Sequence, residues 1–97
     1  MIRVKVKPEI ITVSGHANFD EYGKDIVCAS VSSIVTTSVN AILSFDKNAI
    51  KYTVKEGLIS IEKISNDDTT DTLLGNMINV LEDLANDYPK NIKIERE

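Results

Sequence analysis

The stretch Ile26 to Phe45, which has no charged residue, places the strongest limit on how this chain folds. It is 20 residues long in a chain of 97. Eight of its residues are Ser, Thr or Asn, which lowers the free energy gained in lipid below that of a membrane-spanning helix. Its apolar residues recur at helical spacing, and it is too long for one strand. We therefore expect a helix buried on most sides, with a subunit interface as a further surface that could cover it.

The segments before and after this helix alternate between apolar and polar residues, as half-buried strands do. Glu56-Gly57 separates two of them and predicts a hairpin turn. Pro8 separates the first two. The five expected strands are residues 2–6, 10–13, 50–54, 59–61 and 92–94.

A second helix is predicted between the hairpin and the last strand. The segment "SNDDTTDT" has the acidic and hydroxyl residues that favour a helix start, and Pro89 ends the helix. One face is apolar, with Leu73, Leu74, Met77, Ile78, Leu81, Leu84, Ala85 and Tyr88. The order is ββαββαβ, which predicts an α+β two-layer sandwich with two helices on one mostly antiparallel or mixed sheet. We expect residues 1–97 to form a single domain.

Composition limits the partners and the compartment. The net charge is −4 and the basic residues are scattered along the chain, which argues against direct nucleic-acid binding and favours a cationic partner. One cysteine cannot form an internal disulfide, and a small core without Trp makes a homodimer plausible. The first residues, "MIRVKVKPE", do not resemble a secretory signal, so we expect a cytoplasmic protein.

The only histidine and the only cysteine, His16 and Cys28, lie twelve residues apart in "SGHANFDEYGKDIVCASVS". If Asp25 is the N-cap of the first long helix, Cys28 lies in its first turn, where the helix dipole and free N–H groups stabilise a thiolate and an oxyanion. His16 follows Gly15 at the end of the second strand and has a side chain suited to proton exchange near neutral pH. This pattern predicts a cysteine nucleophile and its base.

Several neighbours could support this pair. Asp25 and Ser32 share a helix face with Cys28, because they are three and four residues away. The intervening segment holds Phe19, Tyr22 and Gly23, and we expect it to act as a lid that orders on substrate.

Structural interpretations stand beside the catalytic one. An unbridged cysteine is commonly a small buried hydrophobe, and a lone histidine after a strand is commonly a surface or capping residue. Phe19 and Tyr22 could anchor the loop to the core. We expect no metal site, because the spacing of Cys, His and carboxylates matches no usual ligand set. A redox-sensing thiol would need a resolving cysteine from another molecule.

The motifs "SGHA" and "EYGKDIVCASVS" resemble the signature of the ribosomal-processing cysteine protease family, long known as an uncharacterised domain. The similarity runs through the hairpin and the final helix into "YPKNIKIE". Ser30 stands where the family usually has Ala.

The resemblance implies a cysteine endopeptidase without a cofactor. It would remove a short N-terminal extension of ribosomal protein L twenty-seven after a pair of aromatic residues. Cys28 would be the nucleophile and His16 the general base and acid, with Gly15, Asp25 and Ser32 in less certain supporting roles. The family also implies a homodimer. The alternative is a non-catalytic ribosome-associated assembly or binding module with a buried structural Cys28.

Overall fold

The computed structural model describes residues 1–15 and 22–97, and for residues 22–25 it describes only the backbone. Five strands and two helices follow one another in the expected order, ββαββαβ. The elements are β1 (Ile2–Val6), β2 (Ile10–Ser14), α1 (Tyr22–Phe45), β3 (Ile50–Lys55), β4 (Leu58–Lys63), α2 (Asp68–Asp87) and β5 (Ile92–Arg96).

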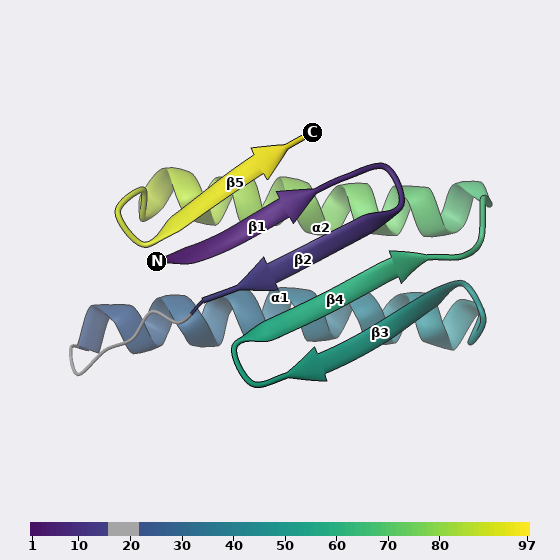
Figure 1. Cartoon of the computed structure of the whole chain (residues 1–97), viewed down its shortest axis with the longest axis horizontal. Helices are drawn as coiled ribbons and strands as arrows, with labels where there is room; N and C mark the ends of the chain where they lie inside the picture. Colours follow the sequence, from purple (N-terminus) through teal and green to yellow (C-terminus); the bar gives the residue numbers. More distant parts are fainter. Residues whose placement is uncertain (16–21) are drawn as a thin grey trace.

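The strands form one mixed sheet in the order β3-β4-β2-β1-β5. The pairs β3–β4, β4–β2 and β2–β1 are antiparallel, whereas β5 runs parallel to β1 at the edge. Both helices lie on the same face of the sheet, which leaves the other face open (Figure 1). The predicted two-layer α+β architecture is therefore confirmed.

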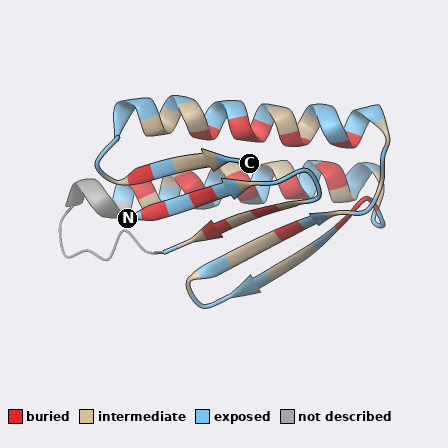
Figure 2. Cartoon of the chain, turned by 45° about the horizontal axis from the view of Figure 1, so that its top comes forward, coloured by how far each residue is buried: buried red, intermediate tan, exposed pale blue. Residues whose placement is uncertain are grey.

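The core fills the space between the sheet and the two helices, where the buried residues of both layers meet (Figure 2). The fully buried positions of α1 are spaced by four, four, four and three residues, which keeps them on one helix face. They are Val27, Val31, Val35, Val39 and Ile42. From α2, Leu74, Met77, Ile78 and Leu81 are buried, and from β1, Ile2 and Val4.

The rest of α1 is more open than the sequence suggested. Among the described residues, one helix, Ile26–Phe45, is long and apolar enough to cross a membrane by length and composition, and only 28% of that stretch is buried. Ile26 and Phe45 are each 56% exposed. The expectation of burial on most sides was wrong for the single chain, because a two-layer fold covers a helix only on the side that meets the sheet and its neighbour helix.

The second helix begins where "SNDDTTDT" predicts. Asp67 is its N-cap and accepts hydrogen bonds from the backbone N–H of Thr70 at 2.7 Å and from the Thr70 hydroxyl at 3.1 Å. Hydrogen bonds from Ser65 and then from Thr70 lower the pKa of Asp67 below its ordinary value. The helix ends at Asp87, and Tyr88 is its C-cap, because the residue before a proline disfavours helical backbone.

Candidate active site

Cys28 is the seventh residue of α1 and lines a pocket of about 240 Å³ between that helix and the sheet. Its side chain is partly buried and packs against the core. Val27 and Val31, on either side of it in sequence, are buried and orient this part of the helix towards the sheet. A partly exposed cysteine beside a hollow is placed for reaction with a ligand, whereas a fully buried structural cysteine would not be. The alternative of a buried structural Cys28 therefore loses its main support.

Three parts of the chain that are distant in sequence form this pocket. The end of β2 contributes Val13 and Gly15, α1 contributes Cys28 and Ser32, and the β3–β4 hairpin contributes most of the remaining wall. The other lining residues are Ile2, Val31, Val54, Lys55, Gly57, Leu58 and Ile59. The pocket is thus largely apolar, with one cation, Lys55, at the hairpin.

Gly15 holds a backbone position that other residues do not fit. Its φ of +87° lies in the left-handed region, and a Cβ built on it would lie 2.3 Å from the carbonyl oxygen of Met1. Its N–H donates to the carbonyl oxygen of Gly57 at 3.1 Å, which ties the end of β2 to the hairpin turn. Gly57, with φ of +72°, supplies the predicted turn between β3 and β4. Glycines thus fix the backbone on the two sides of the pocket that face Cys28.

The prediction that Asp25 is the N-cap of the first helix, with Ile26 as its first residue, was wrong. The helix begins at Tyr22, so Asp25 is its fourth residue and Cys28 lies beyond the first turn. An N–H at that depth bonds to the carbonyl four residues earlier, and the dipole acts mainly within the first turn. Asp is favoured throughout the first turn as well as at the N-cap, so its presence does not identify the first helical residue. The first-turn position that would stabilise a thiolate at residue 28 is therefore not observed.

The sequence of residues 1–93 matches the model of the family described as cysteine protease Prp. The chain belongs to this family. A ribosomal processing cysteine protease Prp from Staphylococcus aureus is 34% identical over 87% of this chain and 82% of its own length. Its counterpart from Mycoplasma genitalium is 33% identical over 100% of this chain and 97% of its own length.

The structures agree with the sequences. The crystal structure of an essential ribosomal processing protease Prp from S. aureus, in complex with a covalently linked product peptide, superposes with a TM-score of 0.90 at 28% identity, and each chain is covered in full. The same S. aureus protease in complex with a substrate peptide gives a TM-score of 0.91 at 27% identity, again with full coverage. The chain is thus a cysteine protease of the Prp family, and its sequence resemblance to that family is confirmed.

The structure brings together some of the predicted Prp site residues. Gly15, Cys28 and Ser32 line one pocket, and the Ser32 side chain is exposed at it. Tyr22 and Gly23, predicted in a lid loop, are instead the first two residues of α1, because the helix starts earlier than expected. His16 and Phe19 lie outside the described residues, as does the side chain of Asp25, so their roles stay predictions.

The sequence interpretation missed the contribution of the hairpin. Val54, Lys55, Leu58 and Ile59 line the Cys28 pocket although they are more than 25 residues away along the chain. The Glu56-Gly57 pattern predicted the hairpin turn, but it did not predict which part of the chain the hairpin contacts. Only the pairing of β4 with β2 brings the turn beside Gly15.

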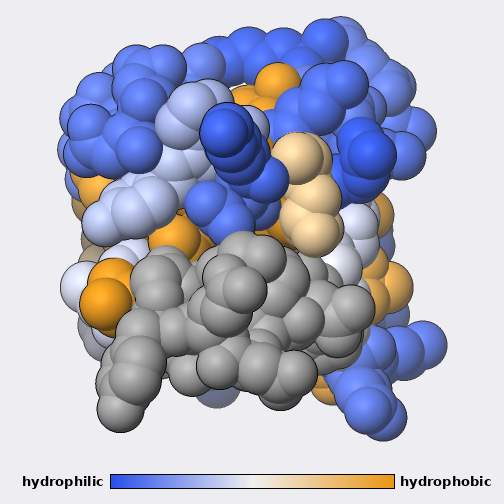
Figure 3. All heavy atoms as spheres, turned by 90° about the vertical axis from the view of Figure 1, so that its left-hand side faces the viewer, coloured by the Kyte–Doolittle hydropathy of each residue, from blue (hydrophilic) through white to orange (hydrophobic). Residues whose placement is uncertain are grey.

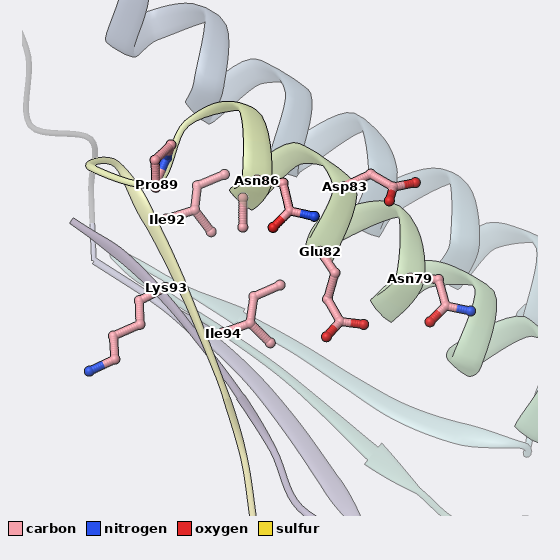
Figure 4. A pocket seen from close by; sticks show the side chains of 9 residues that line it. Asn79, Glu82, Asp83, Asn86, Pro89, Ile92, Lys93 and Ile94 are labelled. Atoms are coloured by element: carbon pink, nitrogen blue, oxygen red, sulfur yellow. The ribbon is translucent and has the colours of Figure 1, made fainter.

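A larger hollow, of about 610 Å³, lies between α2 and β5 (Figure 4). Its labelled side chains include Asn79, Glu82, Asp83 and Asn86 from α2, and Lys93 from β5. Hydrophilic residues cover the end of the molecule where α2 turns into β5 (Figure 3). Cys28 is not among its lining residues, so the smaller pocket beside the thiol is the candidate active site of this Prp family member.

Proposed function

We propose that this chain is a bacterial cytoplasmic endopeptidase that removes the short N-terminal extension of ribosomal protein L twenty-seven. Cys28 is the nucleophile and His16 its general base and acid. The observation that carries the proposal is the placement of the Cys28 thiol on an apolar pocket in a chain of the Prp family. The covalently linked product peptide in the S. aureus relative supports a covalent mechanism.

Chain connectivity supports the pairing of the two residues. Gly15 lines the pocket that contains Cys28, and His16 is the next residue in the chain. The Gly15 N–H donates to the Gly57 carbonyl oxygen, and this hydrogen bond holds the residue before His16 at the pocket.

In the proposed reaction His16 takes the proton of Cys28, and the thiolate attacks the scissile carbonyl carbon. The tetrahedral intermediate collapses with cleavage of the C–N bond, and His16 protonates the leaving amine. Water, deprotonated by the same imidazole, then hydrolyses the thioester and restores the thiol. The apolar walls formed by Val13, Val54 and Ile59 suit apolar or aromatic side chains of the extension.

His16→Ala is expected to slow alkylation of Cys28 by iodoacetamide at neutral pH by about tenfold or more, because the imidazole no longer favours the thiolate. The pH profile of the alkylation rate should shift upward. The measurement is the alkylation rate of the native proteins at several pH values. Urea-unfolded protein is the control, because wild type and His16→Ala should then react at the same rate. An unchanged native profile would contradict the coupled pair.

We also propose that the chain forms a homodimer through α1. An apolar groove between α1 and α2 is lined by Ile26, Ala29, Ser30, Ser33, Ile34, Val80, Asp83, Leu84 and Asp87. Ile26 and Val80 are 56% and 38% exposed, and the residues of α1 from Ile26 onward carry no charge. Covering this face with a second copy would remove apolar surface from water on both chains.

The test is the mass in solution by light scattering at tens of micromolar protein. Wild type should have twice the single-chain mass of 10.7 kDa, and Val80→Asp should shift it towards one chain because it places a carboxylate in the groove. Ile64→Asp is the matched control, since Ile64 is 55% exposed in the segment between β4 and α2. A wild type of single-chain mass would contradict the dimer.

A further inference from the structure

The sheet face away from the helices collects basic residues that are scattered in the sequence. Along each strand, the residues between the core positions point to this open face, which Figure 1 views directly. The face carries five basic side chains, Arg3, Lys5, Lys51, Lys55 and Lys93, and two acidic ones, Glu62 and Glu95. It therefore has an excess of positive charge, although the chain as a whole carries −4.

The strand register arranges these residues in rows across the sheet. One row runs Lys55, Leu58, Ser14, Arg3, Lys93 and holds three cations and no carboxylate. The next row holds Lys5 and Glu95 together with three hydroxyl residues, Thr53, Ser60 and Thr12. Glu95 offsets part of the positive charge of these rows, because its carboxylate forms an ion pair with Arg3 at 3.1 Å and lies 3.9 Å from the Lys93 ammonium.

Part of the negative charge lies on the other layer. The sequence of α2 contains five Asp and Glu residues and no Lys or Arg. The core separates this helix from the open face of the sheet, and a helix alone is about 10 Å across. The Debye length is also about 10 Å at 0.1 M salt, so the acidic layer is screened from a ligand bound on the open face. The argument from net charge against nucleic-acid binding therefore does not apply to this face.

We propose that the open sheet face binds double-stranded RNA through its phosphates. Lysine and arginine side chains neutralise phosphates, and Ser and Thr hydroxyls donate to phosphate and 2′-hydroxyl oxygens. None of the residues that form the two rows is aromatic, so this face lacks the stacking platforms on which single strands are held. The S. aureus relative is named a ribosomal processing protease, and RNA is the polyanion of ribosomes.

The face also meets the candidate active site. Lys55 and Leu58 belong to the three-cation row and line the Cys28 pocket. A bound RNA duplex would thus hold a ribosomal particle beside the pocket. The occupant is inferred from the family and the charge pattern and does not depend on which ribosomal protein is cleaved.

The test is the binding of a labelled ribosomal RNA stem of about 20 base pairs to the full chain, measured by fluorescence anisotropy between 50 and 200 mM KCl. Wild type should bind with an affinity that falls steeply with salt, with a log–log slope of about −4 to −5 for five phosphate contacts. Lys5→Gln/Lys51→Gln should weaken binding about tenfold at 100 mM KCl and reduce the slope by about two. Both residues are exposed and lie outside the Cys28 pocket.

Matched variants separate a local patch from a change in total charge. Lys47→Gln/Lys90→Gln removes the same charge from the loops that follow the two helices and should change affinity by less than about twofold. Glu62→Gln on the face should strengthen binding, whereas Asp83→Asn on α2, with the same charge change, should leave it unaltered. Circular dichroism of each variant checks that the fold is kept.

Four results would overturn the proposal. The first is that wild type does not bind the stem at 50 mM KCl, and the second is that the two double lysine variants lose the same amount of RNA affinity. The third is that an unpaired strand binds more tightly than the stem. The fourth is that the protein binds vesicles rich in anionic lipid and does not bind RNA. The assay contains no peptide substrate and measures no cleavage. Its failure would therefore leave the proposed protease function untouched, and loss of cleavage would leave the RNA result untouched.

Discussion

Cys28→Ser is expected to abolish cleavage of a peptide spanning the junction between the extension and the body of ribosomal protein L twenty-seven. The loss should be at least about a thousandfold in kcat/KM, because a hydroxyl does not ionise near neutral pH and removal of a nucleophile removes most of the catalysis that it takes part in. The measurement is product formation by mass spectrometry. The fold should be kept, since serine differs from cysteine by one atom and the side chain is only partly buried.

The matched control for this variant is Ser33→Ala on the same helix. Ser33 lines the groove between the helices and is not among the residues that line the Cys28 pocket. Its cleavage rate should stay within about threefold of wild type, because the change adds no bulk and removes no group from the pocket. Cleavage by Cys28→Ser at the wild-type rate would show that the nucleophile has been assigned to the wrong residue.

Gly15→Ala is expected to destabilise the fold by about 2–4 kcal/mol, the range of backbone strain combined with a steric clash. The added Cβ would lie 2.3 Å from the Met1 carbonyl oxygen, at a φ of +87° that L-residues rarely adopt. The clash is hard to relieve, because β1 is held between β2 and β5 and the Ile2 N–H donates to the Asn91 carbonyl at 2.8 Å. The measurement is the free energy of unfolding from urea titration.

Gly75→Ala is the matched control, because a Cβ at Gly75 meets nothing within 4 Å. Gly75 lies within α2, where alanine should stabilise the helix by about 0.5–1 kcal/mol. The same chemical change should therefore have opposite signs at the two glycines. A wild-type unfolding midpoint for Gly15→Ala would mean that the end of β2 adjusts freely and does not hold the pocket wall in place.

The sequence predicted the fold well because its elements depend on local patterns. Residues 2–6 alternate strictly, and the apolar residues of α1 recur at three and four, so each segment is compatible with one regular structure. The start of α1 was placed four residues late, at Ile26 instead of Tyr22. Several positions in the first turn can satisfy the preference for an acidic residue, so a single Asp does not determine which residue is the cap.

The candidate site was predicted in part. The sequence drew attention to Cys28 and Gly15 because the chain has one cysteine and because the surrounding motifs resemble a family signature. The hairpin wall formed by Val54, Lys55 and Leu58 was missed, since nothing near these residues in sequence indicates that they meet Gly15. Strand pairing between β2 and β4 decides that contact.

The sequence by itself determined the element order, the family and the candidate nucleophile, because periodicity and motif spacing are properties of neighbouring residues. Only the tertiary structure decided which walls surround that sulfur and on which face the charges gather. Both depend on strand order and register, which bring together residues from distant parts of the chain, so that a chain of net charge −4 acquires a basic sheet face.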